Sequence, residues 1–203
     1  VFYYITVMNE NYAHPALPEG AEAGILKGMY PLREAGKGKP RVTLLGSGTI
    51  LREVLAAAEL LESEFHVAAE VMSVTSFSEL RRDALDCEHF NLLHPGGKRR
   101  VPYLEQCLAG RKGPFIAATD YMKIVADQIR SWVPGAYRVL GTDGFGRSDA
   151  REPLRSFFEV DRRWVALAAL TELAAAGAVE TAVVKKAIRK FGIDPDKPNP
   201  VTC

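Results

Sequence analysis

Four short, largely apolar runs along the middle of this chain constrain its fold more than any other feature. They occupy residues 42–45, 68–75, 115–119 and 137–140. Apolar residues at helical spacing follow the first run, over residues 51–61. Strands that are apolar throughout are buried on both faces, and strands joined through helices run parallel. We therefore expect an α/β fold, with a mainly parallel sheet in a three-layer α/β/α arrangement.

Further helices and one more strand complete the expected pattern. A short helix over residues 21–27 should end at Gly28, and a strand is expected at 29–33. Pro31 cannot donate a backbone hydrogen bond, so that strand belongs at an edge of the sheet. The remaining helices are predicted at 76–86, 122–129, 162–176 with Asp161 as its cap, and 184–191 ending at Gly192.

The composition excludes several classes of function. The chain has 26 basic and 25 acidic side chains, and a net charge of +1 gives no general field to hold a nucleic acid. Residues 98–100 form a basic cluster after two glycines, as is typical of a solvated loop. Cys87, Cys107 and Cys203 lack metal-ligand spacing and suit a reducing compartment. No apolar run is long enough for a membrane span, so we expect a cytoplasmic protein.

Two glycine-bearing segments follow expected strands, where open α/β sheets place ligands. Gly46-Ser47-Gly48 lacks the third glycine of a dinucleotide fingerprint and the lysine of a P-loop, so a ligand-free turn is favoured over phosphate binding. Residues 141–149 are the densest glycine segment, and their charged side chains could contact an ion or a carboxylate. A structural turn or interface is the slightly favoured alternative, and Asp149 with Glu152 resembles a capping box that begins a helix.

The first residues also favour a strand. Residues 1–8 are almost wholly apolar and require sheet neighbours that this sequence does not supply, so we expect the chain to be a fragment. The polar segment that follows contains Glu10 and His14. A carboxylate and an imidazole at the end of a strand can transfer protons near neutral pH. From spacing alone, the favoured role of Glu10 is to satisfy backbone donors in a turn.

The other candidate nucleophiles and bases have no such setting. His66 is expected to end a helix, where the carbonyl end favours a positive ring. His89 and His94 are expected in an irregular region with no recognisable ligand partner. Cys87 near His89 could suggest a thiol nucleophile, but no third group to orient the pair lies nearby in the sequence.

Seven motifs can be compared with known families, and they lie at residues 3–12, 18–20, 44–48, 73–77, 86–88, 119–123 and 137–149. These motifs resemble the carboxyl-terminal region of a known family, the bacterial homodimeric pyruvate dehydrogenase decarboxylating component. This family belongs to the transketolase-like thiamin diphosphate enzymes. The resemblance covers nearly the whole chain, and its last motif is quite specific.

The resemblance implies two structural units. Residues 1–27 would be the end of a preceding pyrimidine-binding domain plus a linker, and residues 28–203 a transketolase-like carboxyl-terminal domain. The sheet of that domain would carry an antiparallel edge strand. In the family the loop that matches residues 10–14 borders the active site, so the resemblance assigns catalytic roles in substrate handling and proton transfer to Glu10 and His14.

The resemblance also implies the reaction and its partners. The full-length enzyme would decarboxylate pyruvate with thiamin diphosphate and magnesium and acetylate the lipoyl group of a dihydrolipoamide acetyltransferase, acting as a homodimer. Both cofactors would be bound mainly by domains outside this sequence, because residues 142–144 lack the first glycine of the diphosphate motif. The fragment alone would then be inactive. Two alternatives remain open, a non-catalytic dimerisation or docking domain using residues 121–132 or the turn at Gly144, and a fragment of transketolase or another thiamin enzyme.

Overall fold

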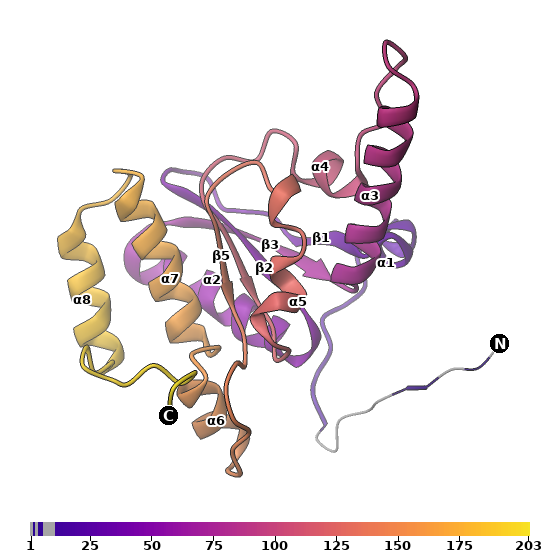
Figure 1. Cartoon of the computed structure of the whole chain (residues 1–203). Helices are drawn as coiled ribbons and strands as arrows, with labels where there is room; N and C mark the ends of the chain where they lie inside the picture. The colour runs from indigo at the N-terminus through magenta and orange to yellow at the C-terminus, as the bar shows by residue number, and fades with distance from the viewer. Residues whose placement is uncertain (1, 3, 6–10) are drawn as a thin grey trace.

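The computed structural model describes residues 2, 4, 5 and 11–203 (Figure 1). Within these residues, five strands form one sheet in the order β1–β3–β2–β4–β5. Strands β2 to β5 pair in parallel, whereas β1 pairs antiparallel with β3 at one edge. The strands are β1 (Met29–Arg33), β2 (Arg41–Gly46), β3 (Ala68–Val74), β4 (Phe115–Ala118) and β5 (Tyr137–Leu140).

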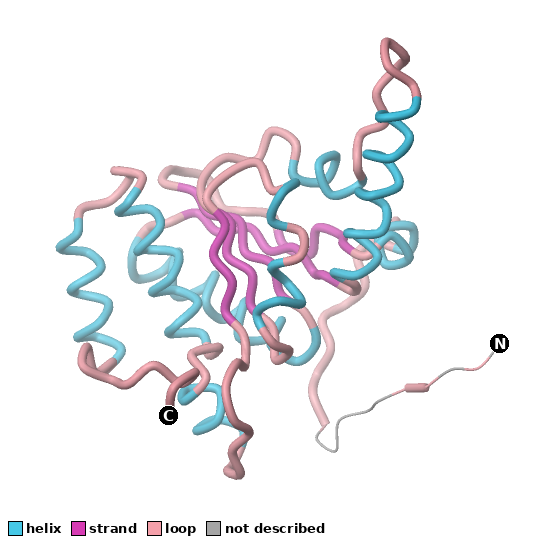
Figure 2. Tube along the Cα trace, viewed as in Figure 1, coloured by secondary structure: helices cyan, strands magenta, loops and turns pink. Residues whose placement is uncertain are grey.

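Helices cover both faces of the sheet (Figures 1 and 2). One face packs against α2 and α7, with α8 outside α7, and the other packs against α3, α4 and α5. The predicted α/β/α layering is therefore confirmed. The helices are α1 (Glu22–Lys27), α2 (Leu51–Phe65), α3 (Phe77–Leu93), α4 (Tyr103–Leu108), α5 (Lys123–Asp127), α6 (Arg151–Phe157), α7 (Arg162–Ala175) and α8 (Thr181–Phe191), and two short 3₁₀ helices span Gly48–Ile50 and Arg130–Trp132.

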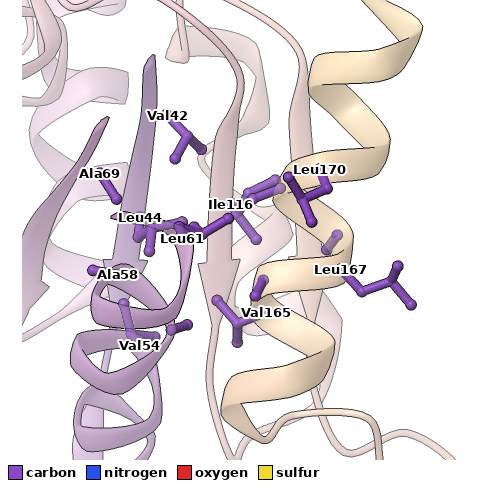
Figure 3. Close-up of a cluster of buried hydrophobic side chains, with 14 of the residues drawn as sticks. Val42, Leu44, Val54, Ala58, Leu61, Ala69, Ile116, Val165, Leu167 and Leu170 are labelled. Carbon is purple, nitrogen blue, oxygen red and sulfur yellow. The ribbon is translucent and has the colours of Figure 1, made fainter. Parts of the chain in front are cut away.

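The register of the central strands divides the core into two layers. Leu44 of β2 lies beside Val71 and Ile116, and all three side chains point to the α2–α7 face. Leu45, the next residue, points to the α3–α5 face with Met72. Figure 3 shows the first layer, in which side chains from the strands meet those of α2 and α7. Alternation along buried strands thus lets each central strand contribute to both cores.

Turn and cap residues end several elements where the sequence predicts. Gly28 ends α1 in a left-handed conformation, and Gly192 does the same for α8. The carboxylate of Asp161 accepts hydrogen bonds from the backbone N–H groups of Arg163 and Trp164 and so caps α7. The strand that contains Pro31 lies at an edge of the sheet, as expected.

One helix prediction in the middle of the chain needs correction, and one helix was missed. Helix α3 continues to Leu93, so His89 lies inside a helix and His94 lies at its end, not in an irregular region. No proline or glycine interrupts the sequence before Pro95, and helix formation therefore continues beyond the packed part of α3. Helix α4 was not predicted. It is only six residues long and is stabilised by burial of Leu104 and Leu108 rather than by a long periodic pattern.

The helix start predicted at Asp149 is also wrong by one residue. Ala150 is the N-cap of α6, and the carboxylate of Asp149 accepts a hydrogen bond from the N–H of Ala150 instead. The first helical hydrogen bond runs from the N–H of Leu154 to the carbonyl of Ala150. If Asp149 were the cap, Pro153 would have to donate that first bond, and it has no N–H.

The strand expected at residues 1–8 lies largely outside the described residues. Phe2, Tyr4 and Ile5 are exposed and lie outside regular secondary structure. The strand and the division into residues 1–27 and 28–203 therefore stay predictions. The tail packs on the domain, because Lys197 bonds to Glu159 at 2.8 Å.

The close approach at Gly28 yields a stability prediction. A Cβ at this position would lie 2.6 Å from the carbonyl oxygen of Ser76, in a backbone with a φ of +100°. Gly28→Ala should therefore lower the free energy of unfolding by about 2 kcal/mol or more. Gly20→Ala is the matched control, since Gly20 also has a positive φ but no atom near the added Cβ. Urea denaturation measures both, and equal losses would contradict the packing explanation.

Candidate functional site

The carboxyl ends of the parallel strands open into a hollow of about 1420 Å³ with a mixed, largely apolar lining. Residues 11–15 and Leu17 form one wall of the hollow, so the segment that precedes the domain lies against the sheet's carboxyl edge. His14 is part of this wall and is exposed. Glu10 lies outside the described residues. The opposite wall consists of Tyr30, Ser47, Gly48, Thr49, Leu51, Arg52, Leu55, residues 73–78, Tyr121 and Val125.

The hollow lies where the strand order reverses. The connection after β2 leads to β3 on one side of β2, and the connection after β3 leads to β4 on its other side. Such switch points are where open α/β sheets bind ligands. Here the two strand ends are joined by a buried hydrogen bond of 2.8 Å from the Ser47 hydroxyl to the Thr119 hydroxyl. The Thr119 hydroxyl in turn accepts a hydrogen bond from the N–H of Tyr121. The floor of the switch point is thus closed by protein contacts.

The turn at Gly46-Ser47-Gly48 has a structural explanation. A Cβ on Gly46 would lie 2.9 Å from the Cα of Leu51, so glycine allows α2 to begin close to β2. Gly48 has a φ of +55°, and the carboxylate of Asp120 lies 3.3 Å from where its Cβ would be. A carboxylate beside the turn repels a phosphate. The ligand-free alternative is therefore the one that these contacts support.

The glycine-rich segment 141–149 is fixed to the β4–α5 turn. The Thr142 hydroxyl donates to the carbonyl of Asp120 at 2.6 Å, and the Asp143 carboxylate accepts from the N–H of Lys123 at 3.0 Å. A Cβ on Gly141 would lie 2.7 Å from the carbonyl oxygen of Tyr121. These contacts support the structural-turn alternative for the first half of the segment.

Tyr12 connects the wall of the hollow to the domain. The guanidinium carbon of Arg52, on α2, lies 4.0 Å from the centre of its ring. Arg155, on α6, donates a hydrogen bond to the Tyr12 hydroxyl at 3.1 Å. Arg52 and Arg155 were not identified from the sequence, because each lies far along the chain from Tyr12 and has no local pattern that links it to that residue.

Arg155 also belongs to a buried charge network around Glu53. The Glu53 side chain is only 8% exposed and accepts two hydrogen bonds from the guanidinium of Arg162, at 2.8 and 3.2 Å. Arg155 lies 3.6 Å from the carboxylate oxygen that also accepts the longer of these two bonds. Burial by itself raises the pKa of Glu53, but the hydrogen bonds and charge of Arg162, aided by Arg155, outweigh it and lower the pKa below the ordinary 4.5. The carboxylate therefore stays ionised and links α2, α6 and α7.

The remaining candidates form no reactive cluster. Cys87 is buried, and burial raises the pKa of its thiol, with a further contribution from Asp83. His89 is exposed two residues further along the same helix, so the two side chains point to different faces. His94 stacks on Phe90 with a centroid distance of 3.9 Å. Among residues 2, 4, 5 and 11–203, no group of three His, Cys, Asp or Glu side chains could hold a metal ion.

Comparison with known proteins gives consistent matches. A family model described as the transketolase-like TK C-terminal domain matches residues 28–161. Pyruvate dehydrogenase E1 components from Pseudomonas aeruginosa and Escherichia coli are 62% and 56% identical to the chain over 100% and 98% of its length. The chain spans 23% and 22% of these two relatives. None of the described helices is both long and apolar enough to cross a membrane.

Solved transketolases share the fold at low identity. A split-gene transketolase, described as an inactive β4 tetramer, is 17% identical with a TM-score of 0.50, over 72% of this chain and 42% of its own. A Pichia stipitis transketolase is 18% identical with a TM-score of 0.50, over 75% of this chain and 19% of its own.

The mixed sheet, its antiparallel edge strand and the hollow at its carboxyl edge define a transketolase-like α/β domain. The chain belongs to the transketolase-like C-terminal domain family, and along its whole length it matches the C-terminal part of bacterial pyruvate dehydrogenase E1 components.

The Glu53 network yields a pH prediction. Because folding lowers the pKa of Glu53, its contribution to stability is present above the unfolded pKa near 4.5 and is lost as the pH falls through the lower folded value. Glu53→Gln should cost about 2 kcal/mol at pH 7, since it leaves two arginines without a carboxylate. The difference in stability between the wild type and Glu53→Gln should become smaller below pH 4.5.

Chemical denaturation from pH 3 to pH 7 measures this difference. Glu64→Gln is the control, because Glu64 forms an exposed ion pair with Lys190. Its substitution should change stability much less at every pH. A Glu53→Gln loss that does not depend on pH would contradict the proposed ionisation.

Proposed function

We propose that this chain is part of an enzyme that decarboxylates pyruvate and reductively acetylates the lipoyl group of a dihydrolipoamide acetyltransferase. The observation that carries the proposal is the 62% identity to a pyruvate dehydrogenase E1 component over the whole chain. Within this function, the chain contributes the C-terminal domain and one wall of a site completed by other domains.

The cofactor of such an enzyme, thiamin diphosphate with magnesium, does not fit the described residues. The turn at Gly48 faces the carboxylate of Asp120, which repels a diphosphate. Within the described ranges no cluster of metal ligands is present. We therefore propose that other domains of the full-length protein bind both groups, and we assign no cofactor contact to this chain.

The proposed catalytic residues are Glu10 and His14. Both belong to the polar segment that precedes the domain, and His14 lines the hollow at the carboxyl edge of the sheet. An imidazole can accept a proton at one ring nitrogen and donate one from the other near neutral pH. Glu10 stands four residues before His14 in the sequence, and a carboxylate can orient a substrate or exchange a proton with it. Each role concerns proton transfer during the reaction of the 2-oxo acid.

The proposed setting follows from the same function. The enzyme acts as a homodimer in the cytoplasm, early in the oxidation of the product of glycolysis, and its macromolecular partner carries lipoyl groups. The absence of metal-ligand and disulfide spacing among Cys87, Cys107 and Cys203 supports a reducing compartment.

A second candidate function is a dimerisation or docking domain without chemistry of its own. One observation favours it. Large apolar side chains are exposed beside the hollow, where Tyr121 and Ile124 are 60% and 62% exposed and Phe145 in the glycine-rich segment is 80% exposed. Exposed apolar side chains mark an interaction surface where they form one patch, and the docking function proposes that these side chains do.

A third candidate, a fragment of transketolase or another thiamin enzyme, has weaker support. The transketolase structures share 17% and 18% identity with the chain, and that level of similarity supports a common fold alone. The much higher identity to pyruvate dehydrogenase components favours the first proposal.

The catalytic assignment is tested in the full-length protein. Glu10→Gln and His14→Ala should each lower pyruvate decarboxylation and lipoyl acetylation by about 10²-fold or more, because each removes a proton-transfer group. Glu19→Gln and His89→Ala are matched controls of the same residue types and should retain near-normal rates. Near-normal rates for both site variants would refute the assignment.

The docking alternative is tested by sedimentation of the 203-residue chain. If this function is correct, the chain sediments as a dimer, and Ile124→Ser shifts it to a monomer by placing a polar group in the interface. Leu26→Ser is the control, since Leu26 is also exposed but lies on α1. A stable monomer that binds no component of the complex would contradict the docking function.

A further inference from the structure

Tyr12 is the one residue in the segment 11–14 that is partly buried, while its neighbours on either side are exposed. Its ring lies under the guanidinium of Arg52 at 4.0 Å, a distance typical of a cation–π contact. Its hydroxyl accepts a hydrogen bond from Arg155, whose guanidinium carbon is 5.9 Å from the ring centre. Two cations from different helices thus hold one aromatic side chain.

Both cations belong to helices of the domain, and the side chain of Arg155 is held there by a buried carboxylate. Arg155 is only 15% exposed and lies 3.6 Å from Glu53, a carboxylate already bound by Arg162 through two hydrogen bonds. Its charge is therefore only partly neutralised, which strengthens its interaction with an acceptor such as the Tyr12 hydroxyl. Arg52 precedes Glu53 directly on α2, so the same turn of helix supplies one cation and anchors the other.

The position of Tyr12 in the sequence gives this contact its functional meaning. Tyr12 lies midway between Glu10 and His14, the two proposed proton-transfer residues. A shift of about 1 Å in a catalytic group can lower a rate by about 10²-fold. A contact that fixes Tyr12 therefore limits how far His14, two residues later, can move.

We infer that Tyr12, Arg52 and Arg155 form a clamp that positions the catalytic segment against the C-terminal domain. The three are positioning residues, because they act through Glu10 and His14 rather than on the substrate. The catalytic part of this inference rests on the proposed function, whereas the clamp itself is a property of the 203-residue chain.

The first test measures order in the segment itself. Backbone ¹⁵N relaxation of Ala13 and His14 in the 203-residue chain should show an ordered segment in the wild type. Tyr12→Leu removes both contacts, so the order parameters of Ala13 and His14 should become typical of a free tail. Tyr12→Phe keeps the ring under Arg52, so its order parameters should lie between those of the wild type and those of Tyr12→Leu. Tyr121→Leu, at an exposed tyrosine in the same hollow, is the control and should leave the segment unchanged. Equal order in the wild type and Tyr12→Leu would overturn the clamp.

The second test measures its effect on turnover in the full-length protein. Tyr12→Phe should lower kcat about fivefold through loss of one hydrogen bond, and Tyr12→Leu about 10²-fold, while KM for pyruvate changes by less than about twofold. Arg155→Met should lower kcat at least as much as Tyr12→Phe does. Arg155→Lys keeps a donor and should recover part of that loss of kcat. Arg138→Met, which breaks an ion pair with Glu172, is the arginine control.

The shape of the pH profile separates positioning from simple loss of folded protein. Displaced proton-transfer groups should change the pH dependence of kcat in Tyr12→Leu, whereas a smaller folded fraction only scales the profile. If Glu10→Gln and His14→Ala lose activity but Tyr12→Leu does not, the positioning role is overturned. If none of the three loses activity while the segment still loosens in Tyr12→Leu, the proposed function fails and the clamp stands.

Discussion

Burial of the sheet on both faces is the constraint from which the rest of the molecule follows. The central strands β2, β3 and β4 have almost no polar side chain that could face water, so each face requires a layer of helices. Parallel strands then require crossover connections, and every crossover returns the chain to the same edge. The carboxyl ends of all four parallel strands therefore meet at one side of the domain. The loops that follow these strands lie together at this edge, and the hollow forms between them.

Much of this architecture could be predicted from the sequence, because the signals are local. The strands follow from apolar runs, and the ends of α1, α7 and α8 follow from Gly28, Asp161 and Gly192. The exceptions have equally local causes. Helix α4 is too short for a periodic pattern, and the start of α6 depends on Pro153, which has no N–H and so cannot donate the first helical hydrogen bond.

The candidate site was less predictable, because its contacts join distant parts of the chain. The segment with Glu10 and His14 was selected by a resemblance and not by spacing, and only His14 lies among the described residues. Arg155 lies 143 residues from Tyr12, and no periodicity links two positions so far apart. Asp120 likewise reaches Gly48 only because β4 returns beside β2. Long-range pairs of this kind are fixed by topology, which the local pattern determines only in outline.

The two outer strands carry a consequence for assembly. β1 is five residues long, contains Pro31 and has a register shift before Arg33, and β5 is four residues long with Arg138 facing outward. Short edges with a proline, a bulge or a charge resist pairing with a strand from another molecule. The sheet is thereby protected from growing sideways into a larger sheet or an aggregate. Copies of this domain that associate must do so through side chains at the loop edge or on the helices, where recognition depends on shape and not on backbone hydrogen bonds.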